Sequence, residues 1–201
     1  MHDALTFIIR LCLFAAMHSL LALPLVKKIL TNQNQSRQQP YRLVYNLISL
    51  TMLGWVMASY RNTPVLYVVP GVWSLIMYLV QAVLLVILLK CVRQTGTAEF
   101  LGLRKYDATT GRSRLVTSGC YGIVRHPLYL FSTLFLLFNP ILTSRWLIFS
   151  AFSTIYFVIG ALLEERRLLK EYGDEYRIYR KDTPFIIPDL SLIRRVSSPG
   201  D

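Results

Sequence analysis

Cysteine, histidine and acidic residues are all scarce in this chain of 201 residues. The three cysteines, Cys12, Cys91 and Cys120, are odd in number and lack the spacing of metal ligands, so the sequence supports neither a disulfide framework nor a zinc site. No glycine-rich Gly-x-Gly-x-x-Gly motif follows a strand-like run, which argues against a soluble dinucleotide-binding or adenosyl-binding fold. No serine or cysteine pairs convincingly with a histidine and a carboxylate, so a nucleophilic triad is not supported either.

Apolar residues, by contrast, are abundant: 54% of the chain is hydrophobic and its mean hydropathy is +0.44. A membrane-spanning helix needs about 20 apolar residues, with about 17 as a lower limit. The sequence therefore predicts an all-α integral membrane bundle of about five transmembrane helices, the last two forming a helical hairpin. The apolar runs cover residues 4–26, 43–60, 65–89, 128–143 and 146–163.

The first apolar run is predicted to be a membrane helix and not a signal peptide. It lacks a basic segment before it and a small-residue cleavage site after it, and Lys27 and Lys28 follow instead.

The net charge of +11 is unevenly distributed, and most of the 22 lysines and arginines lie in segments 27–42, 90–125 and 166–195. These segments are the first and third connections between the predicted membrane helices and the segment after the fifth helix, so all three would lie on one side of the membrane. Positive residues mark the cytoplasmic side of membrane proteins, so we expect the N-terminus outside and the C-terminus in the cytoplasm. This distribution suits a lipid bilayer as the partner and argues against nucleic acid.

One polar cluster lies where residues 115–129 lead into the fourth apolar run. Proline is tolerated in the first turn of a helix, so this segment would hold titratable side chains at the mouth of a membrane helix. The candidate residues here are Gly119, Tyr121, Arg125, His126, Pro127 and Tyr129.

A second polar cluster lies where the fifth apolar run ends. Helical spacing places Glu165, Tyr172, Tyr176 and Tyr179 near one face of a C-terminal amphipathic helix, with Glu164 adjacent. The hairpin would bring the two clusters together on the cytoplasmic side. Together they would suit a zwitterionic cofactor that carries an adenine ring. The carboxylates could bind its ammonium group, an arginine or backbone N–H groups could bind its carboxylate, and the tyrosines could contact its adenine ring. Metal binding by two glutamates and a histidine is conceivable, but the spacing supports it weakly.

His18 is a titratable residue inside the first apolar run, beside Ser19. Such groups are costly in a membrane and usually face the bundle interior. Two interpretations stay open: a group on the substrate side of a site, or a histidine that hydrogen-bonds between helices.

The two clusters together resemble a known superfamily. The segments Leu-Val-x-x-Gly-x-Tyr-x-x-x-Arg-His-Pro-x-Tyr and Glu-Glu-x-x-Leu-x-x-x-Tyr-Gly-x-x-Tyr-x-x-Tyr, within residues 115–188, are similar to those of isoprenylcysteine carboxyl methyltransferases and phospholipid methyltransferases. The segments Tyr41–Asn46 and Phe100–Arg104, with His18, resemble a bacterial branch that contains methanethiol S-methyltransferase-like proteins and membrane proteins associated with nitric oxide metabolism.

The resemblance implies an S-adenosylmethionine-dependent methyltransferase in a bacterial inner membrane. Residues 1–91 would be a three-helix scaffold, 92–188 the catalytic and cofactor-binding part, and 189–201 a polar tail. The segment before Phe100 lacks the histidine and aspartate expected of the thiol enzymes, so the acceptor stays open among a thiol, a carboxylate and an amine. The resemblance implies catalytic roles for Arg125 and Glu165. It implies cofactor-binding roles for Gly119, Tyr121, His126, Pro127, Tyr129, Glu164, Glu165 and Tyr176.

Two alternatives remain. One is an inactive accessory or transport protein on the same fold. The other is an NADPH-dependent sterol-type reductase, which Pro127 after the histidine, the Glu164–Glu165 pair and the small number of spans disfavour.

Overall fold

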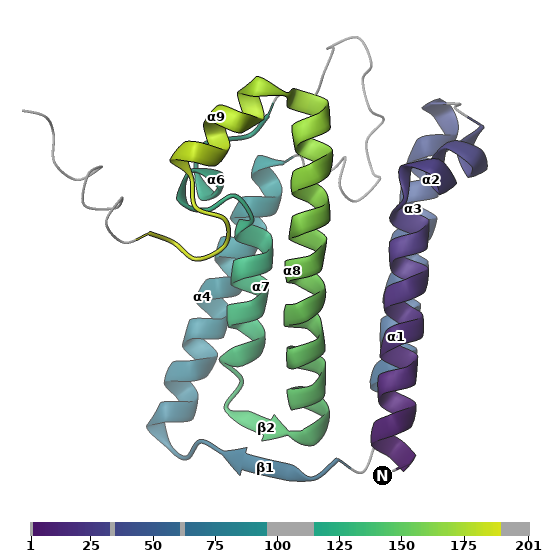
Figure 1. Cartoon of the computed structure of the whole chain (residues 1–201). Coiled ribbons are helices and arrows are strands. Elements are labelled where there is room, and N and C mark those ends of the chain that lie inside the picture. Colours follow the sequence, from purple (N-terminus) through teal and green to yellow (C-terminus); the bar gives the residue numbers. More distant parts are fainter. Residues whose placement is uncertain (1, 33–34, 61–62, 96–114, 190–201) are drawn as a thin grey trace, which may run out of the picture.

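The computed structural model describes residues 2–32, 35–60, 63–95 and 115–189. Figure 1 shows long helices side by side, with the chain running up and down between two ends. The elements are α1 (His2–Ala22), α2 (Pro24–Thr31), α3 (Gln35–Met57), β1 (Val65–Val68), α4 (Val72–Gln94), α6 (Cys120–Ile123), α7 (Pro127–Leu137), β2 (Ile141–Thr143), α8 (Ser144–Tyr172) and α9 (Asp174–Asp182).

The predicted all-α membrane bundle is confirmed. Helices α1, α4 and α8 are each long and apolar enough to cross a membrane. Helix α3 has 23 residues but begins with a polar stretch, and α7 has only 11 residues. The count of five spans therefore stays a prediction.

The helices pack in two groups joined by α8. Helix α3 packs on α1, α4 packs on α7, and α8 contacts both α7 and α1. A buried cluster of Phe7, Leu11, Val56 and Tyr60 lies between α1 and the end of α3, and Phe149 and Phe152 of α8 pack against it. This cluster fixes the first two helices against the last long one.

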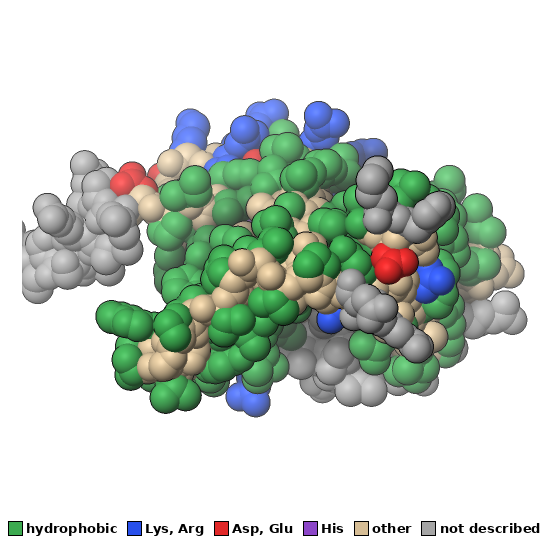
Figure 2. All heavy atoms as spheres, turned by 90° about the horizontal axis from the view of Figure 1, so that it is seen from below, with side chains coloured by type: hydrophobic (Ala, Val, Ile, Leu, Met, Phe, Trp, Pro, Cys, Tyr) green, Lys and Arg blue, Asp and Glu red, His purple; other side chains and the backbone are tan. Residues whose placement is uncertain are grey.

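Much of the apolar surface faces outward. Leu75 and Leu79 of α4 are 67% and 65% exposed, and hydrophobic side chains predominate on the end that carries the two strands (Figure 2). A soluble protein seldom exposes continuous apolar surface on this scale, so this surface fits contact with lipid.

The two strands are an element that the apolar runs did not predict. Residues Val65–Val68 and Ile141–Thr143 lie at the borders of two apolar runs, where a short loop and a tight turn were expected; instead they pair as an antiparallel ladder with Val65 opposite Thr143 and Val68 opposite Ile141. Pro64, Pro70 and Pro140 border these segments, and proline interrupts helices while valine and isoleucine favour strands. The α7–α8 hairpin is confirmed, and its turn contains β2.

The C-terminal region also differs from the expected single helix. Helix α8 ends at Tyr172, and Gly173 adopts a φ of 59°, a left-handed conformation that favours glycine. Helix α9 then turns back over the end of the bundle (Figure 1). It buries Tyr176 and Tyr179 on one face and is therefore amphipathic, as expected, but it is not continuous with α8.

Arg145, at the start of α8, is predicted to hold the end of α3 in place. Its guanidinium donates to the carbonyl oxygens of Met57 at 3.2 Å and Tyr60 at 2.9 Å. Because these bonds have a charged donor, Arg145→Ala should lower the free energy of unfolding by about 1.5–3 kcal/mol. Thermal unfolding in detergent would measure this loss. The exposed Arg166→Ala on the same helix is the control, and an equal effect of both variants would contradict the assignment.

Candidate functional site

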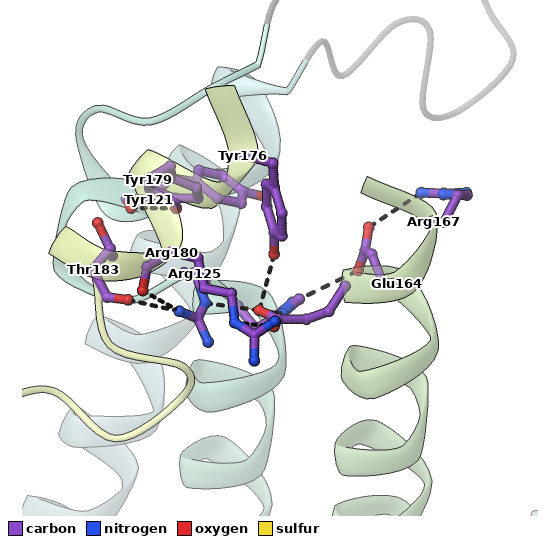
Figure 3. A network of polar contacts seen from close by, with 10 residues as sticks. Tyr121, Arg125, Glu164, Arg167, Tyr176, Tyr179, Arg180 and Thr183 are labelled. Carbon is purple, nitrogen blue, oxygen red and sulfur yellow. Dashed lines mark hydrogen bonds and ion pairs between the residues drawn. The ribbon is translucent and has the colours of Figure 1, made fainter. Parts of the chain in front are cut away.

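The hairpin brings the two predicted clusters together, and the carboxylate of Glu165 lies at their centre. Glu165 is only 8% exposed. Its Oε1 lies 2.7 Å from Nε of Arg125 and 3.3 Å from Nε2 of His126, and it accepts a 2.9 Å hydrogen bond from the Tyr176 hydroxyl. Its Oε2 lies 3.5 Å from Nε of Arg180. These contacts join the start of α7, the end of α8 and α9 (Figure 3).

Arg125 ties the C-terminal segment to this centre. Its guanidinium donates to the carbonyl oxygens of Arg180 at 2.7 Å and Thr183 at 3.1 Å. Its backbone N–H donates to the carbonyl oxygen of Pro184 at 2.8 Å, and its guanidinium lies 5.6 Å from the ring centroid of Phe185. These hydrogen bonds hold the end of α9 and the segment that follows it against the start of α7.

His126 lies between the two glutamates. It precedes α7, whose first residue is the buried Pro127, and is itself 4% exposed. Its Nδ1 lies 3.7 Å from Oε2 of Glu164. Its ring stacks on Tyr129 at 5.7 Å and meets the edge of Phe185 at 5.1 Å. The imidazole is therefore held in one orientation by rings on two sides.

Glu164 is the more accessible of the two carboxylates. Its side chain is 32% exposed against 10% for Glu165. It forms an ion pair with Arg167 at 3.3 Å, drawn in Figure 3, and lies within hydrogen-bonding reach of Tyr129. Glu164 can accept a new cationic partner more readily than Glu165, whose contacts are buried.

Three tyrosines form one wall of the site. The rings of Tyr176 and Tyr179 meet edge to face at 5.9 Å, and the Tyr179 hydroxyl donates to the carbonyl oxygen of Tyr121 at 2.6 Å. Burial, reinforced by the charge of Glu164, raises the pKa of Tyr121 to about 12. Burial and the neighbouring Glu165 raise the pKa of Tyr176, and burial raises that of Tyr179. All three hydroxyls therefore stay protonated near neutral pH.

Gly119 is fixed against the end of α4. It has a φ of 65°, and a Cβ there would lie 2.0 Å from the side-chain nitrogen of Gln94. The side-chain oxygen of Gln94 accepts a 3.0 Å hydrogen bond from the backbone N–H of Cys120. Gly119 is thus needed for close packing of this loop, independently of any ligand.

The expectation that the cysteines form no disulfide framework was wrong for one pair. Cys91 and Cys120 form a disulfide between the end of α4 and the loop after Gly119, with their Cα atoms 5.7 Å apart, while Cys12 is free. Their separation of 29 residues carries no pairing signal, and only the packing of α4 on α6 brings them together. The described residues contain no group of three metal-ligating side chains that could hold an ion.

Among the predicted residues, His18 lies outside this centre. It belongs to a separate polar cluster between α1, α3 and α8. The pattern of residue types did not indicate Gln94, Arg180, Thr183 or Phe185 as part of the site. Arg180, Thr183 and Phe185 contribute through their backbone carbonyl oxygens, which accept hydrogen bonds from Arg125 and His126. The spacing of residue types in a sequence does not indicate such contacts.

A protein-family match covers most of the chain. Residues 6–185 match the family described as NnrU protein. The chain belongs to the NnrU protein family. Parts of it are also similar to curated methyltransferases, which confirms the predicted resemblance to methyltransferase-like membrane proteins.

Three such relatives carry the name methanethiol S-methyltransferase. Methanethiol S-methyltransferase 1 of Bradyrhizobium diazoefficiens is 41% identical over 75 residues, which is 37% of this chain and 26% of the relative. The Pseudomonas deceptionensis protein is 40% identical over 35% of this chain and 27% of the relative. The Mycobacterium tuberculosis protein is 35% identical over 34% of this chain and 28% of the relative. The chain thus matches about a quarter of each relative's length. No solved structure matches.

The disulfide should be detectable and should stabilise the protein. Because the cytoplasm keeps most thiols reduced, the pairing is to be measured on protein purified in air. We expect peptide mapping of that protein without reductant to find Cys91 linked to Cys120 and Cys12 alone to be labelled by a thiol reagent. Cys91→Ser should lower the free energy of unfolding by about 3 kcal/mol, because the open loop has more freedom when unfolded. Cys12→Ser is the control, and labelling of all three cysteines in the folded protein would contradict the pairing.

Tyr176 should contribute stability that depends on pH. Tyr176→Phe removes a buried donor to Glu165 and should cost about 1–3 kcal/mol near neutral pH. The folded-state pKa of Tyr176 is raised, so its contribution is present below the unfolded-state pKa and is lost as pH rises through the folded-state pKa. Melting temperatures of the wild type and the variant should therefore differ by a constant amount from pH 7 to about 10 and converge only at higher pH. Tyr78→Phe, at an exposed position of α4, should show neither effect.

Proposed function

We propose that this membrane protein is an S-adenosylmethionine-dependent methyltransferase. The observation that carries the proposal is the meeting of two carboxylates at the end of α8 with a buried arginine and histidine at the start of α7, under a wall of tyrosines. S-adenosylmethionine carries an ammonium, a carboxylate, a sulfonium and an adenine ring. The same small region offers Glu164 for the ammonium group, backbone N–H groups for the carboxylate and tyrosine rings for adenine.

We assign different tasks to the two glutamates. Glu164, partly exposed and shared with Arg167, would bind the ammonium group of the cofactor. Glu165 is buried with four partners, so we propose that it positions Arg125, His126 and Tyr176 and does not act as a base. This proposal replaces the catalytic roles expected for Arg125 and Glu165 with positioning roles.

The remaining cofactor contacts follow from exposure and ring geometry. Tyr121 and Tyr129, which are partly exposed, would contact adenine, and backbone N–H groups of the Gly119–Gly122 turn would face the cofactor carboxylate. Tyr176 is fully buried, so it would support the site through its hydrogen bond to Glu165. His126 and Pro127 would shape the floor of the pocket from the first turn of α7.

The chemistry asks little of the protein beyond positioning. Bound S-adenosylmethionine supplies an activated methyl group, and transfer is an in-line displacement. Holding donor and acceptor in line while excluding water can lower the barrier by roughly 7–11 kcal/mol. The buried, rigid centre around Glu165 suits that task.

Acceptor, topology and division of the chain belong to the same proposal. The acceptor is a thiol, a carboxylate or an amine; the relatives named above act on methanethiol by name. We place the protein in a bacterial inner membrane with the N-terminus outside and the site on the cytoplasmic side, where positive residues gather. Residues 92–188 would form the catalytic part on a scaffold of residues 1–91.

Binding of S-adenosylhomocysteine to detergent-purified protein tests the proposal. We expect calorimetry to detect binding and Glu164→Gln and His126→Ala each to weaken it about 10-fold or more, since each removes a charged or buried polar contact. Glu171→Gln, at an exposed position on the same helix, should bind as the wild type does.

The outcomes separate the alternatives. Absence of any binding by the folded wild type would refute the methyltransferase and favour an accessory protein. Binding that both Glu164→Gln and His126→Ala leave unchanged would refute this site. Labelled S-adenosylmethionine, offered with methanethiol, fatty acids, prenylcysteine analogues and amines, would then identify the acceptor.

A further inference from the structure

The Cys91–Cys120 disulfide lies at the same end of the bundle as the Glu165 centre. Cys91 is in the last turn of α4 and is fully buried, and Cys120 is the half-buried first residue of α6. Helix α6 packs against α4 at the end of the bundle that α9 covers (Figure 1). The bridge is therefore a covalent link between a membrane-length helix and the loop that precedes α7.

The loop that this bridge holds contributes directly to the proposed cofactor pocket. Tyr121 follows Cys120 in the chain, and its carbonyl oxygen accepts the 2.6 Å hydrogen bond from the Tyr179 hydroxyl. The Tyr179 ring meets the ring of Tyr176, whose hydroxyl donates to Glu165. A continuous set of contacts thus runs from the disulfide to the buried carboxylate.

Two polar contacts would still hold the loop on α4 if the bridge were opened. The Cys120 N–H donates to the Gln94 side chain at 3.0 Å, and the Tyr121 hydroxyl lies within hydrogen-bonding reach of Thr95. Gln94 and Thr95 are both exposed, so water can replace these bonds at little cost. Reduction should therefore loosen the loop without removing it from the site.

The predicted topology puts this disulfide where disulfides are uncommon. The positive residues place this end of the bundle in the cytoplasm under the proposed function. The cytoplasm keeps most thiols reduced, and the disulfides that form there are usually catalytic or redox-sensing. Two cysteines with Cα atoms 5.7 Å apart at that position are therefore suited to respond to redox conditions.

We propose that Cys91 and Cys120 form a redox switch: closure of the bridge tightens binding of S-adenosylmethionine, and reduction of the bridge weakens it. This inference rests on the proposed methyltransferase function. The closed bridge fixes the Gly119–Gly122 turn and Tyr121 before the cofactor arrives, so binding need not order them. The cost of ordering a single backbone residue corresponds to about a 10-fold change in affinity, which is the effect that we expect.

Closure of the bridge by glutathione disulfide balances in two steps. The Cys120 thiol, the more accessible of the two, loses its proton, and its thiolate attacks one sulfur of glutathione disulfide. The S–S bond of glutathione disulfide breaks and releases one glutathione thiolate. The Cys91 thiolate then attacks the Cys120 sulfur of the mixed disulfide and releases the second. The two cysteines are oxidised, glutathione disulfide is reduced to two glutathione molecules, and the two cysteine protons pass to these through solvent.

Calorimetry with S-adenosylhomocysteine on detergent-purified protein tests the switch. We expect the oxidised wild type to bind about 10-fold more tightly than the same protein reduced with dithiothreitol. Cys91→Ser and Cys120→Ser should bind as the reduced wild type does under both conditions. Cys12→Ser, at an exposed position of α1, should keep the full redox dependence. Melting curves would verify that each protein is folded at the temperature of the titration.

Thermodynamic linkage supplies a second measurement on the wild type alone. A ligand that prefers the oxidised form stabilises that form by the same factor. Saturating S-adenosylhomocysteine should therefore lower the reduction potential of the pair by about 30 mV for a 10-fold preference. Thiol labelling across a series of glutathione buffers would measure this shift.

The failures are distinguishable. A wild type that binds no S-adenosylhomocysteine in either redox state refutes the proposed function, and this inference with it. Equal affinities of the oxidised and the reduced wild type, with no shift in potential, refute the switch alone. Tighter binding by the reduced protein refutes the assigned direction. A bridge that stays closed in a glutathione buffer as reducing as the cytoplasm would be a permanent link and would also refute the switch.

Discussion

The buried charge of Glu165 constrains the polar end of this molecule more than any other interaction. Removing a carboxylate from water costs several kcal/mol unless cations and hydrogen-bond donors replace the lost hydration. Arg125, His126, Tyr176 and Arg180 supply that replacement from both sides of α8 along the chain. Each partner in turn fixes an element: α7 through His126, α9 through Tyr176 and the chain after α9 through Arg125.

Two glycines, a glutamine and the disulfide at this end of the bundle stabilise the same arrangement. Gly173 lets α9 turn back so that the Tyr176 hydroxyl reaches Glu165. Gly119, Gln94 and the disulfide hold the preceding loop on α4, so that the Tyr121 carbonyl meets the Tyr179 hydroxyl. The proposed cofactor pocket is therefore built on contacts that exist without the cofactor, which favours binding because little ordering remains to be done.

The sequence predicted the class of fold, and the two polar clusters that it singled out do lie together in the structure. Apolar runs report burial in lipid directly, and the two motif segments carry their chemistry in the types of residue at Arg125, His126, Glu164 and Glu165. It did not predict β1 and β2, because valine and isoleucine are as apolar in a strand as in a helix.

It also could not divide the work between the two glutamates. Glu164 and Glu165 are residues of the same type at adjacent positions, so the sequence around them does not distinguish their roles. The helix directs their side chains to different neighbours, and only Glu165 faces Arg125 and Arg180. Partners that act through a carbonyl oxygen, such as Thr183, have no signature in residue type. The disulfide was missed because only the packing of α4 brings its two cysteines together.

The contacts of Glu165 also determine when the site can form during biosynthesis. Arg125 and His126 are synthesised before Glu165, whereas Tyr176 and Arg180, which complete its contacts, follow it in α9. While α8 enters the membrane, its carboxylate therefore has only part of its final coordination. A chain that stops after α8 would insert its helices and still lack Tyr176 and Arg180, so the buried charge of Glu165 is fully compensated only after α9 has left the ribosome.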